Sequence, residues 1–578
     1  MVNKSLVSVM FMITMLFSPI TESRGQNAEA YFKHQIDSLD NITSASFVSI
    51  REIKQPHPQY TIRIKTQKEF DALNNTITKA LQEGYSNIRV LLSRGTYYFH
   101  ENHIRRKNED FPNVSITIEG KHAVLTSDEE YKRCKAPKNP WTDVVQLDTT
   151  IEVVDIIGKL CRVPSPDDWE RRRITKVQVP QWYKAPTYKV KKIDNTGVYF
   201  VVPELSYVTG YKYNGYSINM DYLYKGIMPR YRLYDESMEP KCKASKFIYI
   251  ENSTYMSFSI NGLHFNGNKA GNELITLGKV NAERISICDC RFENIRGIVA
   301  LFSGTGNILI DNNTITETDG EEIKFVNGCN NVKVTNNLFD KCGRGLRNTL
   351  CVTCWESVYY IADNVFRDFG YGAVGVGVWE GTTKTLPSQG IIEHNEIYYT
   401  PSYFSDYARH TLMDSGAIYT WTQNDDVLIR YNYIHNYNGA ADNRGIFCDD
   451  GASNIKIYGN KIINTPNSYC IASRHVKDQR SDYQNNSYNL MAYNIIDGAV
   501  CFMGYGLEER HCRKGSNFIL DNGQNKVIRN RISNLEIEAP DICIKGSLSG
   551  NQLVVSKKVR KQLKSTIKDK FINAQIVY

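Results

Sequence analysis

A short asparagine-centred pattern recurs along the C-terminal half of the chain and limits the possible folds more than any other feature. The pattern is two apolar residues one apart, a gap of two, usually Asn, one residue, and then Ile or Phe. It fits residues 308–315, 332–339, 359–366, 427–434 and 455–462, and most of it returns around Asn395, Asn494 and Asn530. Successive copies are 23 to 37 residues apart, which is typical of solenoid coils with loops of varying size.

Each part of the pattern has a physical role in such a coil. Alternating apolar residues point to one side of a short strand, and Asn tolerates a left-handed turn where its amide can bond the Asn of the next coil. In the earlier coils, Leu263 and Cys290 take its place. We therefore predict an all-β fold, a right-handed parallel β-helix, in which these Asn residues have a structural role and no chemistry.

The rest of the chain divides around this solenoid. Residues 1–26 have the basic start, apolar run and polar end of a signal peptide, so we expect a protein exported to the periplasm or the extracellular space. Residues 27–135 predict an N-terminal cap and the first coils, with a helix that begins at a capping box of Thr66 and Glu69 and ends at Gly84. Residues 136–245 predict an inserted small β domain, 246–550 the main β-helix, and 551–578 a basic C-terminal cap. No segment after the signal peptide is apolar for long enough to span a membrane.

Charge and cysteine content narrow the possible partners. A formal net charge of +8 is modest for 578 residues, so we expect no nucleic-acid partner. The 14 Cys are irregularly spaced, and buried thiols are as consistent with them as disulfides. Cys351 and Cys354 form a lone CxxC without a second pair nearby, which does not predict zinc. We expect neither a metal nor a cofactor.

Chemistry-bearing residues gather on a second strand that precedes the repeat frame in several coils. Carboxylates on neighbouring coils would stand roughly 5 to 10 Å apart, a range that covers the separations used by retaining and inverting glycosidases. Asp450 is the first candidate for a catalytic acid or base, Asp414 the second, with Asp449 and Glu380 behind them. A turn-capping role is the competing interpretation for each. The candidate substrate-binding residues are Trp379, Trp421, Tyr419, Arg444, Arg474, His475, His410 and Glu322.

An expected register assigns the faces of these strands. With Ile418 and Phe447 facing the core side by side, Tyr419, Trp421, Cys448 and Asp450 would face outward. Asp449 would then point inward, where an unpaired carboxylate is costly, so we expect it at a strand end or a bulge.

Residues 413–460 also carry a family likeness. The segments Asp-Ser-Gly-Ala-Ile-Tyr-x-Trp, Ile-Arg-Tyr-Asn-Tyr-Ile-His and Gly-Ile-Phe-Cys-Asp-Asp-Gly-Ala-Ser resemble the right-handed β-helix glycoside hydrolases, a pectate-lyase-like group that includes β-xylosidases and α-galactosidases. The resemblance implies cofactor-free hydrolysis by paired acids on neighbouring coils, here Asp450 or Asp449 with Asp414 or an acid one coil away.

Three functions fit the sequence. The favoured one is an exo-acting glycoside hydrolase whose substrate is an oligo- or polysaccharide of plant or host origin. A polysaccharide lyase acting on uronates is the alternative, with Lys324, Arg344, Arg347 or Arg474 as possible basic groups. A non-catalytic glycan-binding solenoid is the third, and the clustering of the acids within a few coils argues against it.

Overall fold

The computed structural model describes most of the solenoid and parts of the segments around it. The described residues are 34, 36–52, 59–129, 131, 145–146, 160–178, 187–201, 212–213, 216–217, 230–239, 245–268, 273–343, 349–378, 388–400, 415–421, 425–437, 443–449, 452, 454–465, 467–472, 490–492, 494–503, 525–528, 531–537, 546–547, 552–554 and 575–577. The predicted signal peptide and nearly all of the predicted C-terminal cap lie outside them.

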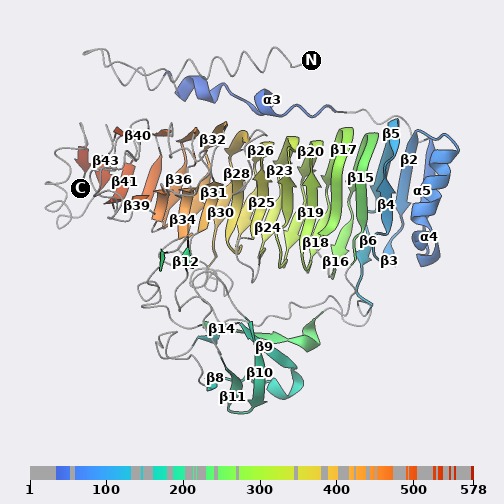
Figure 1. The fold of residues 1–578 in the computed structure, drawn as a ribbon, viewed down its shortest axis with the longest axis horizontal. Coiled ribbons are helices and arrows are strands. Elements are labelled where there is room, and N and C mark those ends of the chain that lie inside the picture. Colours follow the sequence, from blue (N-terminus) through green and yellow to red (C-terminus); the bar gives the residue numbers. More distant parts are fainter. Residues whose placement is uncertain are drawn as a thin grey trace.

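Parallel strands stacked coil upon coil form one long solenoid (Figure 1). Each strand pairs with the corresponding strand of the coils before and after it, for example Ile308 with Val332 and Val332 with Tyr359. Strands that follow one another in the sequence therefore contribute to different faces, and residues a few dozen positions apart lie side by side. This is the parallel β-helix that the sequence predicts, and parallel crossovers are right-handed in nearly all proteins.

Three strands in each coil build three faces of the solenoid. We call the face whose strands directly precede the asparagine turn the ladder sheet. It contains β2 (Asn87–Leu92), β5 (Asp110–Glu119), the second halves of β15 (Ile248–Asn261) and β17 (Glu273–Cys288), β20 (Gly306–Asp311), β23 (Asn330–Thr335), β26 (Val358–Ala362), β29 (Gln389–Glu393), β32 (Asp426–Arg430), β35 (Ile455–Tyr458), β38 (Leu490–Ala492), β40 (Asn525–Ile528) and β42 (Gly546–Ser547), with β1 (Tyr60–Ile64) paired to β2.

The second face consists of short strands after the asparagine turn. They are β3 (Gly95–Tyr98), β6 (Ala123–Thr126), β16 (His264–Asn266), β18 (Arg291–Glu293), β21 (Thr314–Thr316), β24 (Leu338–Asp340), β27 (Val365–Arg367), β30 (Glu396–Tyr398), β33 (Tyr433–His435), β36 (Lys461–Ile463), the first residues of β39 (Ile495–Met503) and β41 (Arg531–Ile537), then β43 (Gln552–Val554) and β44 (Gln575–Val577).

The third face carries the residues considered below, and we call it the site sheet. Its strands are β4 (Ile104–Lys107), the first halves of β15 and β17, β19 (Ile298–Ser303), β22 (Ile323–Val326), β25 (Leu350–Trp355), β28 (Gly372–Gly377), β31 (Ser415–Trp421), β34 (Asn443–Asp449), β37 (Asn467–Ala472) and the later parts of β39 and β41.

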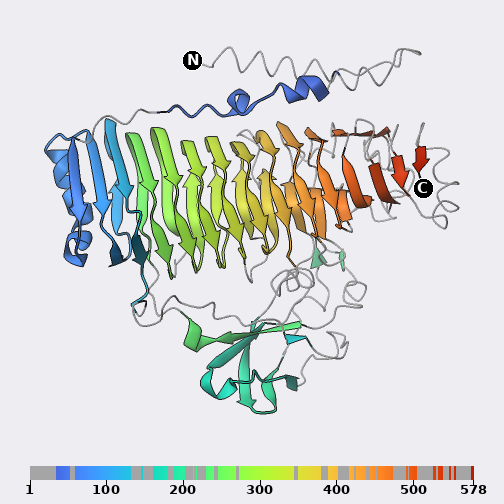
Figure 2. The ribbon, with the colours of Figure 1, turned by 180° about the vertical axis from the view of Figure 1, so that it is seen from behind.

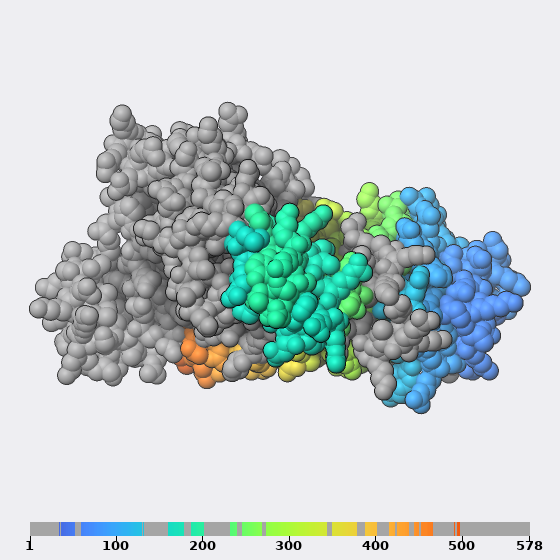
Figure 3. Space-filling view, turned by 90° about the horizontal axis from the view of Figure 1, so that it is seen from below, coloured from blue at the N-terminus to red at the C-terminus, as the bar shows by residue number. Residues whose placement is uncertain are grey.

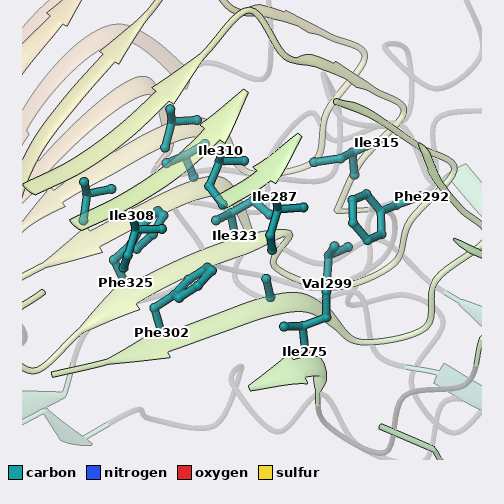
Figure 4. Packing of buried hydrophobic residues seen from close by; sticks show 14 of the residues in the cluster. Ile275, Ile287, Phe292, Val299, Phe302, Ile308, Ile310, Ile315, Ile323 and Phe325 are labelled. Atoms are coloured by element: carbon teal, nitrogen blue, oxygen red, sulfur yellow. The ribbon is translucent and has the colours of Figure 1, made fainter. Parts of the chain in front are cut away.

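Apolar side chains from all three faces fill the interior. Figure 4 shows Ile275, Phe302, Ile308, Ile315 and their neighbours pointing into one continuous core. Like residues stack between coils, as Phe302 does on Phe325 and Phe339 on Phe366, with ring centroids 5.1 and 4.7 Å apart. Stacking of this kind places each apolar residue above one from a neighbouring coil, so the core is continuous along the solenoid.

The predicted asparagine column is present. Asn337, Asn364, Asn395, Asn432 and Asn460 are fully or almost fully buried, and the side-chain nitrogen of each donates to the side-chain oxygen of the next ladder Asn at 3.0 to 3.1 Å. The left-handed backbone position is the residue before the ladder Asn, for example Asn336, Asp363 and Tyr431. The prediction that the ladder Asn itself takes that conformation is therefore wrong, although the turn and its amide bonds are as expected.

The helices near the N-terminal end cover the open edge of the first coils. The capping box forms as predicted, since Glu69 N–H donates to Thr66 Oγ1 and Thr66 N–H donates to the Glu69 carboxylate. The predicted single helix is instead α4 (Gln67–Asp71) and α5 (Leu73–Gln82), which meet at Ala72. Leu73, Ile77 and Leu81 of α5 belong to the buried core of the solenoid.

A separate antiparallel sheet lies within the range predicted for the inserted domain. It consists of β7 (Val145–Gln146), β8 (Leu160–Val163), β9 (Ile174–Gln178), β10 (Thr187–Asp194), β11 (Gly197–Val201) and β14 (Arg230–Asp235). Two 3₁₀ helices, Trp169–Arg171 and Glu236–Met238, lie in the segments between or after these strands. A two-stranded pair, β12 (Lys212–Tyr213) and β13 (Tyr216–Ser217), is separate from it. Figure 3 shows the six-stranded sheet as a compact body in front of the solenoid when the molecule is seen from below.

Candidate functional site

Four neighbouring strands of the site sheet bring part of the predicted site together. Trp355 of β25 pairs in register with Gly377 of β28, Gly377 with Trp421 of β31, and Trp421 with Asp449 of β34. Chain positions almost a hundred residues apart thus form one row across adjacent coils. Adjacent rungs are about 4.8 Å apart, so Asp449 and Trp421 lie within reach of one sugar ring.

The register between β31 and β34 corrects the expected orientation of Phe447 and Cys448. Ile418 pairs with Ile446 and not with Phe447. Ile446 and Cys448 consequently belong to the buried core, whereas Phe447 packs in a separate cluster on the outer side. Asp449 is the last residue of β34, the strand end expected for it, and lies on that outer side with Trp421 and Tyr419. The expected outward orientation of Cys448 is wrong.

The spacing of the asparagine ladder explains this register. Asn432 and Asn460 are 28 residues apart, and so are the paired residues Ile418 and Ile446. Aligning the glycines Gly416 and Gly445 gives a spacing one residue too long, and a shift of one residue exchanges the two faces of a strand. The ladder spacing was therefore the better guide to the register of this strand.

The Asp449 carboxylate is held by the tyrosine of the neighbouring coil. Tyr419 Oη donates to Asp449 Oδ2 at 2.6 Å, and Tyr419 and Asp449 are only 5 % and 6 % exposed. A hydroxyl that donates to a carboxylate at this distance stabilises the charged form and fixes its orientation. A carboxylate that is buried, oriented and on the outer face is the arrangement that general acid–base or nucleophilic catalysis requires.

Aromatic rings surround this pair. The Trp355 and Trp421 rings meet edge to face with centroids 6.1 Å apart, across the glycine Gly377 that lies between them in the row. Tyr419 makes similar contacts with Trp421 and with Phe447, at 6.0 and 5.3 Å. Trp421 is the partly exposed member of the cluster, and its ring offers the apolar area that the C–H face of a sugar can cover.

Arg444 occupies the opposite end of β34. Its guanidinium lies over the Phe447 ring, 4.1 Å from the ring centroid, and the residue is 2 % exposed. A stacked guanidinium is held in one orientation and still presents N–H donors in its plane. Arg444 therefore belongs to the same aromatic cluster as Tyr419 and Asp449.

Glu322, a predicted substrate-binding residue, lies in the interior. In several site-sheet strands two consecutive residues near the start point into the core, as Cys351 and Val352 do in β25. Glu322, directly before β22, occupies this place with Ile323. Gly343 N–H donates to Glu322 Oε1 at 3.0 Å, and Thr318 Oγ1 donates to the same oxygen. Burial, and secondarily the nearby Cys342 thiol, raises the pKa of Glu322 well above its ordinary value. An acid that is fully buried and points into the core cannot contact a glycan at the outer face, so the assignment of Glu322 to substrate binding is wrong.

Another acid near this face, Glu321, is remote from Asp449. Glu321 of the preceding turn pairs with Lys324 through Oε2 at 2.6 Å. Four rungs separate β22 from β34, which corresponds to roughly 19 Å. Glu321 is therefore too distant to act with Asp449, and Lys324 is engaged by Glu321.

Seven predicted site residues lie outside the described residues. They are Asp450, Asp414, Glu380, Trp379, Arg474, His475 and His410. Their roles remain predictions. Among the residues that the structure describes, no group of three or more His, Cys, Asp or Glu side chains could hold a metal ion, and no helix is long and apolar enough to cross a membrane.

Sequence reasoning missed Trp355, Tyr371 and Leu350, which complete the cluster around Tyr419. The sequence did offer a signal for Trp355, because this residue stands two coils before Trp421 at the same strand position. Leu350 fills the space over Gly375, where an added Cβ would come within 2.3 Å of its side chain. That contact depends on packing and leaves no pattern in the sequence.

Comparisons with known proteins find similar architecture at low similarity. No family model and no curated protein matches the chain. Solved structures that match include the A-module of the mannuronan C-5 epimerase AlgE6 of Azotobacter vinelandii (11 % identity, 85 % of this chain and 95 % of that chain, TM-score 0.37). A GH136 lacto-N-biosidase from Eubacterium ramulus matches at 11 % identity over 95 % of this chain and 71 % of that one, with a TM-score of 0.38. A polygalacturonase from Erwinia carotovora ssp. carotovora matches at 12 % identity over 88 % and 99 %, with a TM-score of 0.34.

Proposed function

We propose that the chain is a glycoside hydrolase that acts on an oligo- or polysaccharide at the outer face of β28, β31 and β34. The observation that carries the proposal is the Tyr419–Asp449 contact within an aromatic cluster. Asp449 supplies a fixed carboxylate, Trp421 supplies a surface for a sugar ring, and Arg444 holds the Phe447 ring of the same cluster. No metal or cofactor is part of this proposal.

The proposed reaction needs two carboxyl groups. One protonates the glycosidic oxygen, while the other activates water or attacks the anomeric carbon. Because Tyr419 donates to Asp449, the charged form of Asp449 is favoured, and we assign it the role of base or nucleophile. The acid is then Asp450, Asp414 or Glu380, the three acids predicted from the sequence. We further propose that this reaction takes place outside the cytoplasm, as the N-terminal signal pattern predicts.

The test is turnover by the Asp449→Asn variant. A panel of aryl glycosides and uronate polysaccharides is screened first with the unmodified chain, and Asp449→Asn is then assayed on the best substrate. Removal of a general base lowers the rate about 10²- to 10⁴-fold. Asp450→Asn, Asp414→Asn and Glu380→Gln, assayed in parallel, identify the partner acid.

Asp363→Asn is the matched control for Asp449→Asn. Asp363 is exposed and lies in the left-handed region at φ 58°, where Asn is well tolerated, so this variant should keep full activity. Undiminished turnover in Asp449→Asn contradicts the assignment of the base. A product that absorbs in the ultraviolet because it is unsaturated shows that the enzyme is a lyase, the alternative that the sequence left open.

A further inference from the structure

A segment from the N-terminal region lies across the outside of the solenoid, far along the molecule from the coils that follow it in sequence. We call residues 36–48 the strap; its last turn is α3 (Ser44–Phe47). Figures 1 and 2 show it running along the solenoid, and α3 contacts β26 and β29 of the ladder sheet. The strap thus joins the beginning of the chain to coils more than 300 residues later.

Apolar residues of the strap are buried against this sheet. Leu39 is 1 % and Ile42 is 9 % exposed, and both pack with Ile391, Leu428 and Tyr458 in a cluster separate from the solenoid core. Burial of two such side chains is typically worth a few kcal/mol. The strap therefore has a small hydrophobic core of its own on the outside of the sheet.

Arg430 of β32 fixes the position of the strap by polar contacts. Its two terminal nitrogens donate to the carbonyl oxygens of Leu39 and Ile42, each at 2.7 Å, while its Nε donates to Glu393 at 2.5 Å. Tyr431 Oη donates to Asp40 at 2.6 Å. Because Arg430 is buried and bonded to two backbone groups, the strap has one register on the sheet.

The outer face of the ladder sheet changes character where the strap lies. One outward row runs in register through Lys333, Tyr360, Ile391 and Leu428. It is thus charged or amphipathic in β23 and β26 and aliphatic in β29 and β32. Aliphatic residues on the outside of a sheet need a cover, and the strap supplies it.

Two of the covered coils, those of β29 and β32, are also long ones. Successive ladder asparagines are 24 and 27 residues apart from Asn313 to Asn364, but 31, 37, 28 and 34 apart from Asn364 to Asn494. Longer excursions from a coil raise the entropy cost of closing it. The strands β28, β31 and β34 that carry the candidate site belong to these coils.

We propose that the strap is a clamp that holds the long coils in register and thereby keeps the site-sheet strands β31 and β34 in place. Its contacts to β29 and β32 connect two successive long coils from outside, where their own excursions weaken the stacking. Loss of the strap contacts should loosen these coils and leave the short coils of β20 and β23, which lie outside the main contacts of the strap, unchanged.

The test is hydrogen exchange, followed by mass spectrometry, on the full chain carrying Leu39→Ser and Ile42→Ser together. These residues lie far from Asp449 on a different face, so the variant leaves the candidate site chemically intact. We expect exchange at least about tenfold faster in β29, β32, β31 and β34, with β20 and β23 unchanged, because two buried aliphatic contacts are lost. Asp37→Ser, which alters an exposed strap residue, should change none of them.

Three results would overturn the clamp. Unaltered exchange in the double variant would show that the strap is not needed by the coils it covers. Equal acceleration in β20 and β23 would show a general loss of stability, and acceleration confined to β29 and β32 would show that the site-sheet strands do not depend on the strap. Because exchange is measured without substrate, none of these outcomes depends on whether the chain is a hydrolase.

Discussion

Tyr419 and Asp449 come from neighbouring coils, so the contact between them reports the geometry of the candidate site directly. A hydrogen bond to a charged group is worth about 1.5–3 kcal/mol, which corresponds to a rate effect of roughly ten- to a hundredfold when the charge acts in the reaction. We expect Tyr419→Phe to lower kcat/KM by that factor, because Asp449 loses the donor that fixes its orientation.

Tyr433→Phe is a suitable control for this prediction. Tyr433 lies on the short-strand face, where it stacks on His435 at 4.3 Å. Tyr433→Phe should keep the kcat/KM of the unmodified chain. A Tyr419→Phe variant with unchanged kcat/KM would assign Tyr419 to packing alone.

A second prediction at the residue scale concerns Glu322 and the pH dependence of the unfolding free energy. Its pKa is raised in the folded chain by burial, so the folded state keeps a proton that the unfolded state releases as the pH rises above about 4.5. The unfolding free energy should therefore fall with pH above that value, by up to about 1.4 kcal/mol per pH unit from this group. Glu322→Gln should remove this slope in denaturant titrations performed at several pH values.

The adjacent acid provides the matched comparison. Glu321 is paired with Lys324 on the outer face, and Glu321→Gln should leave the slope in place. Equal slopes in Glu322→Gln and the unmodified chain would mean that Glu322 is ionised in the interior, contrary to its surroundings of Thr318, Gly343 and Cys342.

At the scale of elements, the ladder Asn is the unit that ties one coil to the next. Asn432 Nδ2 donates to the Ile392 and Arg430 carbonyls and to Asn460, while its own oxygen accepts from Asn395. Asn432→Ala leaves several of these buried groups unpaired, at about 1–3 kcal/mol each. We expect it to lower the unfolding free energy by about 3 kcal/mol or more, measured by denaturant or thermal unfolding. Asn330→Ala, at an exposed position in β23, should change the unfolding free energy by less than about 0.5 kcal/mol. Similar losses in both variants would argue against a special role for the asparagine column.

The same elements show what the sequence could and could not predict. The asparagine frame repeats in every long coil, so it identified the ladder sheet, the interior apolar positions and the stacking of distant segments. The site sheet has no such frame, and the expected pairing of Ile418 with Phe447 differs by one residue from the true pairing of Ile418 with Ile446. Glu322 was misplaced because a double inward position breaks simple alternation. The strap was missed because Leu39 and Ile42 lie in no repeat and find their partners only after the coils have formed.

At the scale of the whole molecule, the six-stranded sheet of residues 145–235 stands apart from the solenoid, and the place where the chain leaves is close to where it returns. Ser127 Oγ donates to Asn268 Oδ1 at 2.6 Å, and Asn268 Nδ2 donates to the Ser245 carbonyl at 3.4 Å. One buried Asn thus bridges the departing and returning segments, while β6 and β15 on either side pair within the solenoid.

This closeness predicts that residues 132–244 can be replaced by a short Gly/Ser linker without unfolding the solenoid. The thermal midpoint of the remaining chain should change by only a few degrees, because the strand pairs and the asparagine column are retained and a short linker closes the gap at low entropy cost. Circular dichroism with a thermal scan is the measurement, and Asn268→Ala in the full chain is the comparison, since it breaks the bridge while keeping the antiparallel sheet. Loss of cooperative unfolding in the linker variant, with Asn268→Ala still cooperative, would show that the antiparallel sheet is part of the solenoid's folding unit.

If the linker variant folds and turns over the substrate found for the full chain at the same rate, the antiparallel sheet takes no part in binding that substrate. A raised KM with unchanged kcat would place the sheet in contact with the distal part of the glycan.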